Sequence, residues 1–185
     1  NSNAMMSVEG GVVTATGAIT LGNQSTVGRG GHLRVTGGVL NSTDIAANGG
    51  HIVTRRNNNA STANFFGGVS TVEKITLGFD GAITGGSGTL NVNDGALYLG
   101  EGGVVSNAGG TFAANINLTS GVLGAKADWS TTLPINLPID GNVTINAEHA
   151  THASHDLVLA GALSGAGGLT KIGIGRLTLG GANTF

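Results

Sequence analysis

The chain has 185 residues and a formal net charge of -2, with 35 glycines, 2 prolines and no cysteine. Its hydrophobic fraction of 39% is too high for a disordered chain, and its glycines lack the third-position period of collagen. Without cysteine it has no disulfide and no thiolate, and its sparse charge offers no basic patch for nucleic acid or an anionic membrane surface.

The first residues resemble a cloning remnant, because Ser2-Asn3-Ala4 precedes Met5. We therefore set residues 1–4 apart from the fold. Residues 5–185 are expected to form a single segment excised from a longer protein.

Short segments in which aliphatic and polar residues alternate recur along the chain. This period of two predicts strands with one buried face. In chain order they are Ile19-Thr20-Leu21, Leu33-Arg34-Val35, Ile75-Thr76-Leu77, Leu90-Asn91-Val92, Leu97-Tyr98-Leu99, Ile116-Asn117-Leu118, Val143-Thr144-Ile145, Leu157-Val158-Leu159 and Leu177-Thr178-Leu179.

Glycine-rich steps separate these segments, and they are typical of tight turns that need a positive φ. Examples are Asn48-Gly49-Gly50, Asn93-Asp94-Gly95 and Asn107-Ala108-Gly109-Gly110. No segment has a sustained 3.6-residue period, so we expect a negligible helix content.

An internal repeat relates residues 18–40 to residues 74–97 after a one-residue insertion. Ile19-Thr20-Leu21-Gly22 matches Ile75-Thr76-Leu77-Gly78, and Gly38-Val39-Leu40 matches Gly95-Ala96-Leu97. An offset of this size corresponds to two or three solenoid turns of about 20 to 25 residues each.

Two all-β architectures accommodate many short strands with glycine-rich corners: an antiparallel sandwich or barrel, and a parallel β-helix. A sandwich is expected to carry larger aromatic core residues, whereas aromatics are 4% of this chain. Small aliphatic side chains stack well when each strand pairs with the equivalent strand one turn later. The pattern therefore favours a parallel β-solenoid of short strands with Gly/Asn-rich turns.

The end of the chain resembles a known repeat. Leu163-Ser164-Gly165-Ala166-Gly167-Gly168-Leu169-Thr170-Lys171 is followed by Leu177-Thr178-Leu179 and Gly181-Ala182-Asn183-Thr184-Phe185. These residues are similar to the autotransporter-associated β-strand repeat (passenger-associated transport repeat) of bacterial autotransporter passenger regions, over about residues 157–185. Ile172, Ile174 and Arg176 depart from the usual pattern, at positions expected to be exposed or in turns.

This resemblance implies a right-handed parallel β-helix, displayed on the cell surface at the outer membrane or secreted, with a C-terminal translocator or anchor elsewhere in the protein. It implies a structural β-helical stem that can make adhesive contacts with host or surface glycans or proteins. Two alternatives stay open: a carbohydrate-binding adhesin module, and a β-helical polysaccharide lyase or glycosidase.

Candidate metal ligands occur in one cluster, where His149, His152 and His155 lie close to Glu148 and Asp156. Three imidazoles could bind zinc, but in a strand His152 would point away from the other two. The alternative is a solvated polar loop between two strands, and we expect no metal and no cofactor.

Carboxylates that a β-helical hydrolase would need on consecutive turns are scattered along this chain. Asp94 with Glu101, or Glu73 with Asp80, are the pairs that stacking could bring together. The alternative is isolated surface residues, so we expect no catalytic residues and no enzymatic activity.

Exposed aromatic side chains are candidate sugar-stacking contacts. Tyr98, Trp129, Phe65 and Phe66 are the possible ligand contacts, with Phe79 as a further aromatic. Residues 55–61 break the strand rhythm and are predicted to form a protruding loop. Unpaired strand edges at both ends of the segment predict end-to-end self-association.

Overall fold

The computed structural model describes residues 4–22, 30–42, 60–78, 85–138, 141–149 and 152–185, together with the backbone of residues 51–54. These residues form strands, turns and bends without a helix, which confirms the all-β prediction. The described part accordingly contains no helix suited to crossing a membrane.

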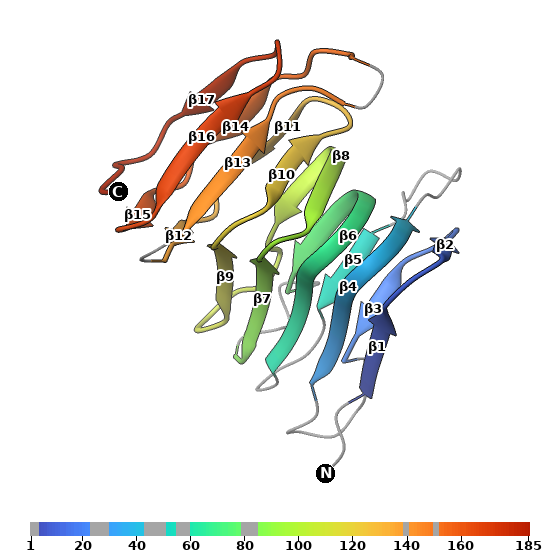
Figure 1. Cartoon of the computed structure of the whole chain (residues 1–185). Coiled ribbons are helices and arrows are strands. Elements are labelled where there is room, and N and C mark those ends of the chain that lie inside the picture. Colours follow the sequence, from blue (N-terminus) through green and yellow to red (C-terminus); the bar gives the residue numbers. More distant parts are fainter. Residues whose placement is uncertain are drawn as a thin grey trace.

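Three sheet faces follow one another within each turn of chain (Figure 1). The first face comprises β1 (Ala4–Val8), the starts of β4 (Gly31–Ser42) and β6 (Ala60–Leu77), β7 (Ser87–Val92), β9 (Ala113–Leu118), β12 (Ile135–Leu137) and β15 (Leu163–Gly165). The second face comprises β2 (Val12–Ala15), the end of β4, the middle of β6, the start of β8 (Ala96–Val105), β10 (Val122–Ala125), β13 (Asn142–Asn146) and β16 (Gly168–Ile172).

The third face is divided into two groups of strands. The first group is β3 (Ile19–Leu21), β5 (His51–Thr54) and the ends of β6 and β8, and the second is β11 (Trp129–Thr131), β14 (Leu157–Leu159) and β17 (Leu177–Leu179). All pairs between these named strands are parallel. The molecule is therefore a parallel β-solenoid, as the sequence predicts.

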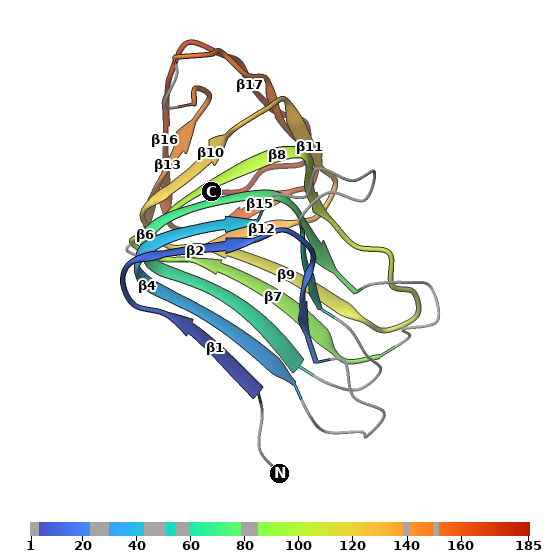
Figure 2. The same cartoon turned by 90° about the vertical axis from the view of Figure 1, so that its right-hand side faces the viewer.

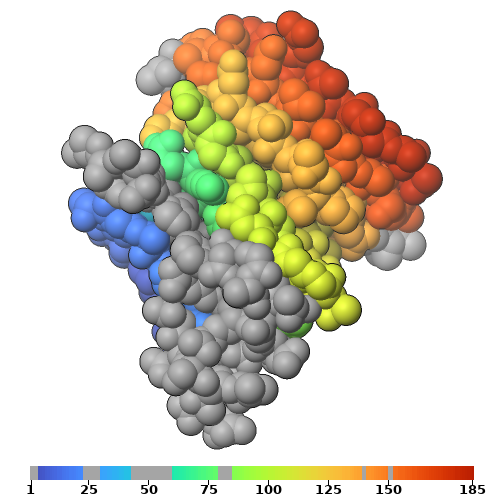
Figure 3. Space-filling model, turned by 180° about the vertical axis from the view of Figure 1, so that it is seen from behind, coloured from blue at the N-terminus to red at the C-terminus, as the bar shows by residue number. Residues whose placement is uncertain are grey.

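Strand register gives the length of each turn. One inward-facing column on the first face contains Met6, Leu33, Ala63, Leu90, Ile116, Ile135 and Leu163. Successive members are 27, 30, 27, 26, 19 and 28 residues apart, so most turns are longer than the 20 to 25 residues expected. Viewed from behind, the turns follow one another as bands of colour from blue to red (Figure 3).

The internal repeat corresponds to two turns of the solenoid. Ile19 pairs with Ile52, which pairs with Ile75. On the second face Leu40 pairs with Ser70, which pairs with Leu97. The repeated residues therefore occupy equivalent positions two turns apart.

The core is formed by the inward residues of the alternating strands, which are mainly valine, leucine and isoleucine. Leu33, Leu90 and Leu118 on the first face and Leu97 and Leu99 on the second have no exposed surface. Burial of a side chain of this size stabilises the fold by about 1.5 to 3 kcal/mol. All nine segments predicted from the period of two are strands in the structure.

A column of glycines forms the corner between the first and second faces, at which the first-face strands β1, β4, β6, β7 and β9 meet the second face (Figure 2). Gly38, Gly68 and Gly121 have φ values of 70°, 68° and 79°. A Cβ atom on Gly121 would lie 2.9 Å from the backbone nitrogen of Gly95 in the previous turn. Glycine is required here both for the positive φ and for the close approach of consecutive turns.

Part of the predicted loop at residues 55–61 is strand. Ala60 and Ser61 begin β6, and the buried Ser61 hydroxyl accepts a hydrogen bond from the backbone N–H of Gly31 at 3.2 Å. The loop prediction is wrong for these two residues because they pair with β7. Residues 55–59 lie outside the described residues.

Candidate functional site

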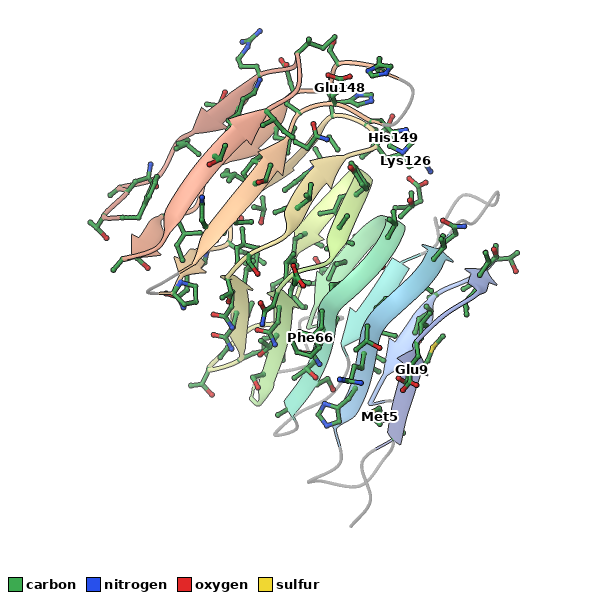
Figure 4. All side chains as sticks on the ribbon, in the orientation of Figure 1. Met5, Glu9, Phe66, Lys126, Glu148 and His149 are labelled. Carbon is green, nitrogen blue, oxygen red and sulfur yellow. The ribbon has the colours of Figure 1, made fainter. Side chains whose placement is uncertain are left out.

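Ionisable side chains gather at the corner between the second and third faces, here called the charged corner. It includes Glu73, Lys74, Glu101, Lys126, Asp128, Glu148, His149, His152, His155, Asp156 and Arg176. Figure 4 shows Lys126, Glu148 and His149 together at this edge, away from Phe66. On a flat parallel face, equivalent residues of consecutive turns stack about 4.8 Å apart, so that like charges in one column would repel each other. At a corner, charged side chains can instead turn toward opposite charges.

Aspartates at the charged corner join consecutive turns. Asp128 Oδ1 accepts a hydrogen bond from the backbone N–H of Asp156 at 3.0 Å. Asp156 Oδ1 accepts one from the backbone N–H of Arg176 at 3.1 Å, and the Arg176 guanidinium lies 3.5 Å from Asp156 Oδ2. These carboxylates are thus occupied in holding the backbone of β14 and β17.

The three candidate metal-binding histidines contact three different partners. The ring of His149 meets Tyr98 edge-on with centroids 5.6 Å apart, His152 pairs with Glu148, and His155 Nδ1 lies 3.4 Å from Asp128 Oδ1. No group of three or more potential ligands comes together among the residues described. The described residues of this segment lie between β13 and β14 and form no regular strand, and His152 has a positive φ of 58°.

Of the two candidate carboxylate pairs, the structure describes both members only for Asp94 and Glu101, and it does not bring these two together. Asp94 lies at the glycine corner and Glu101 at the charged corner, at opposite ends of one second-face strand. Glu73 pairs with Lys126, and Asp80 lies outside the described residues. Asp94 and Glu101 therefore do not provide the two adjacent carboxylates of a glycosidase.

The aromatic candidates divide into buried and accessible rings. Phe65 is 0% exposed and Trp129 is 3% exposed, so the prediction that they present their faces to ligand is wrong. Phe65 points inward on β6, and the Trp129 Nε1–H group donates to the carbonyl of Gly124 at 3.2 Å beneath Tyr98.

Phe66 and Tyr98 keep access to solvent. The Phe66 ring is 37% exposed with the Arg34 guanidinium 5.8 Å from its centroid, and Tyr98 is half-buried over Gly124. The two rings occupy different parts of the second face and its glycine corner, so they do not form one platform. Phe79 lies outside the described residues.

A regular array of amides covers the outer surface of the first face. We call Asn64, Asn91, Asn117 and Asn136 the asparagine ladder, because register places them in one outward column. The Nδ2 groups of Asn91, Asn117 and Asn136 each donate to the Oδ1 of the preceding asparagine, at 2.7, 2.8 and 3.2 Å. Asn64 Nδ2 donates to the carbonyl of Leu33 at 3.1 Å and so anchors the ladder.

The ladder was not identified from the sequence, although a signal is present. Ala63-Asn64-Phe65, Leu90-Asn91-Val92, Ile116-Asn117-Leu118 and Ile135-Asn136-Leu137 share an asparagine between two apolar residues. Each triplet follows the previous one by one turn. This recurrence predicts a stacked amide column once the turn length is known.

No family model, curated protein or solved structure matches the chain. The resemblance of residues 157–185 to autotransporter repeats therefore stays a prediction from the sequence. Ile172 and Ile174 are 45% and 73% exposed, in agreement with the positions expected for two of its departures.

Proposed function

We propose that this chain is a structural stem, a length of β-solenoid that holds another part of a bacterial surface-exposed or secreted autotransporter-like protein away from its anchor. The observation that carries this proposal is the continuity of stacking from β1 to β16, with inward aliphatic columns and an outward asparagine ladder. A rod built in this way obtains its stability from contacts between neighbouring turns and needs no cofactor.

The use of the charged side chains supports the same proposal. Glu73, Asp128 and Asp156 all contact groups of later turns, and so tie one turn to another. These three carboxylates contact neighbouring turns and are not gathered around a common cavity. A stem requires contacts of this kind, whereas a hydrolase requires acids that converge on a substrate.

The test is carried out on the full-length protein in intact bacteria. Antibody against this segment is expected to label unpermeabilised cells, and external protease is expected to remove the label. Replacing the segment by an unrelated β-solenoid of similar length should preserve display of the rest of the protein. Labelling only after permeabilisation, or loss of display in the replacement, would contradict the proposal.

A further inference from the structure

A shallow hollow interrupts the first face at the end of the asparagine ladder. Its volume is about 110 Å³, and its lining consists of Ala114, Asn115, Ile116, Asn117, Pro134, Ile135, Asn136 and Ser164. The hollow arises where β12 has three residues beside the six of β9, so that the start of β9 has no strand partner in β12. Pro134 lies just before β12 and cannot donate a backbone hydrogen bond to extend it.

The lining of the hollow combines uncharged hydrogen-bonding groups with apolar surface. Asn115, Asn136 and Ser164 are exposed and present amide and hydroxyl groups, while Pro134 offers an exposed apolar ring. Pockets that bind small uncharged groups combine apolar surface with a few polar groups that set orientation. No ionisable side chain lines the hollow.

Charge on this face is distant from the hollow. In the outward column, Arg34 is followed by the four uncharged asparagines before Ser164. The ionisable groups of the described turns around the hollow lie instead at the charged corner, apart from Asp94 at the glycine corner and Lys171 on the second face. This distribution favours a neutral ligand, since an anionic one would gain no charge-assisted hydrogen bond here.

The ladder leaves hydrogen-bonding capacity at a regular spacing. Each side-chain amide has two N–H groups, and for Asn91, Asn117 and Asn136 only one of them is used within the described residues. The second N–H of each amide recurs about every 4.8 Å along the solenoid. A linear polysaccharide also repeats its hydroxyl groups, so several weak contacts can be made at once.

We propose that the first face, from Asn91 to Ser164, binds a neutral polysaccharide laid across the turns, with one sugar residue seated in the hollow. Asn136 and Ser164 hydrogen-bond its hydroxyls and Pro134 packs against its ring. This inference goes beyond the stem function and does not depend on it, because a stem without affinity for glycans would still be displayed.

Affinity electrophoresis of the native chain tests the proposal directly. The gels contain a soluble mixed-linkage β-glucan, a xylan, a mannan or an α-glucan, with polygalacturonate as the anionic comparison. Retardation is expected in at least one neutral gel. Asn136→Ala and Ser164→Ala are each expected to raise the dissociation constant for that polysaccharide at least fivefold.

Asn142→Ala is the matched control, because Asn142 is an exposed asparagine on the second face. It should leave retardation unchanged, and circular dichroism should show the same fold and thermal midpoint for Ser164→Ala as for the parent. The proposal is overturned by retardation in no neutral gel, by retardation in polygalacturonate alone, or by equal losses in the Asn142 and Ser164 variants.

Discussion

Glu73 and Lys126 form an ion pair although 53 residues separate them along the chain. Strand register places Glu73, Gly100 and Lys126 in consecutive turns at the charged corner. The Glu73 side chain therefore passes over Gly100, which has no side chain to obstruct it. A glycine between two opposite charges lets the pair join the first and third of three turns.

Gly100→Ala is expected to disrupt this arrangement. A Cβ atom at position 100 would lie 2.9 Å from Glu73 Cδ and 3.1 Å from Glu73 Cα, so both the carboxylate and the backbone must move. We expect a loss of about 1 to 2 kcal/mol in the free energy of unfolding, measured by urea denaturation. Lys126→Ala should cost less than about 1 kcal/mol, because both side chains are partly solvated.

The combination Glu73→Ala with Gly100→Ala provides the control. Truncating Glu73 removes the side chain that the new Cβ atom at position 100 would meet. The loss of unfolding free energy in the double variant should therefore be smaller than the sum of the losses in the two single variants. Additive losses would show that the effect of Gly100→Ala does not arise from Glu73.

Strand positions were predictable from the sequence because burial of one face imposes the period of two directly on the residues. The burial of aromatic rings was not. In Phe65-Phe66 one ring must point inward and the other outward, and only pairing with neighbouring turns decides which. Trp129 is buried because Gly103 in the previous turn leaves space beside its ring.

The contacts of the histidines were also not predictable, for a different reason. Residues 147–149 and 152–156 lie outside the regular strands, and His152 adopts a positive φ. Their partners, Tyr98 and Asp128, come from other turns of the solenoid. Spacing along the chain therefore carries little information about which side chains meet.

Ser70→Ala is expected to stabilise the fold. Ser70 occupies the inward column between Leu40 and Leu97, and its buried hydroxyl has no hydrogen-bond partner within the described structure. Removing an unsatisfied hydroxyl should raise the free energy of unfolding by about 1 kcal/mol. Thermal and urea unfolding measure the change, and a destabilised variant would indicate that Ser70 has a partner such as a buried water.

Asn117→Asp is expected to break the asparagine ladder. Asn117 donates to Asn91 at 2.8 Å and accepts from Asn136 at 3.2 Å. A carboxylate at position 117 can still accept a hydrogen bond but cannot donate one, and its negative charge would face the side-chain oxygen of Asn91. We therefore expect the free energy of unfolding to fall by about 1 to 3 kcal/mol. Asn115→Asp on the same strand is the matched control, because Asn115 is exposed and makes only a long 3.4 Å contact with Thr89. Equal losses in urea denaturation would argue against a stabilising ladder.

Gly121→Ala is expected to lower the stability of the fold more than Gly10→Ala, a glycine substitution in the first turn of the same corner. Its φ of 79° is unfavourable for alanine, and the new Cβ would press on the backbone of Gly95. We expect Gly121→Ala to lower the free energy of unfolding by more than about 1 kcal/mol. Gly10→Ala should have little effect, because a Cβ there meets no atom within 4 Å and φ is not positive. Differential scanning calorimetry of the two variants makes the comparison.

Deleting residues 63–89 is expected to remove one whole turn and leave a folded, shorter solenoid. Ala63 and Leu90 are register partners in adjacent turns, so joining Thr62 to Leu90 continues the strand of β6 as that of β7. Asn91 then occupies the place of Asn64 beside Leu33, and the aliphatic column stays unbroken.

Because stability in a solenoid is approximately a sum over turns and their interfaces, loss of one internal turn should lower the unfolding free energy without abolishing folding. Small-angle scattering should show a maximum dimension shorter by about 4.8 Å, the spacing of one turn. Deleting residues 63–90, which is one residue more, is the matched control. It joins Thr62 to Asn91 and so puts Asn91 in the inward place that Ala63 and Leu90 share. The control shifts the register by one residue and reverses which side chains of the following strand face the core. We therefore expect it to unfold, and equal folding of both deletions would show that turn register does not determine stability.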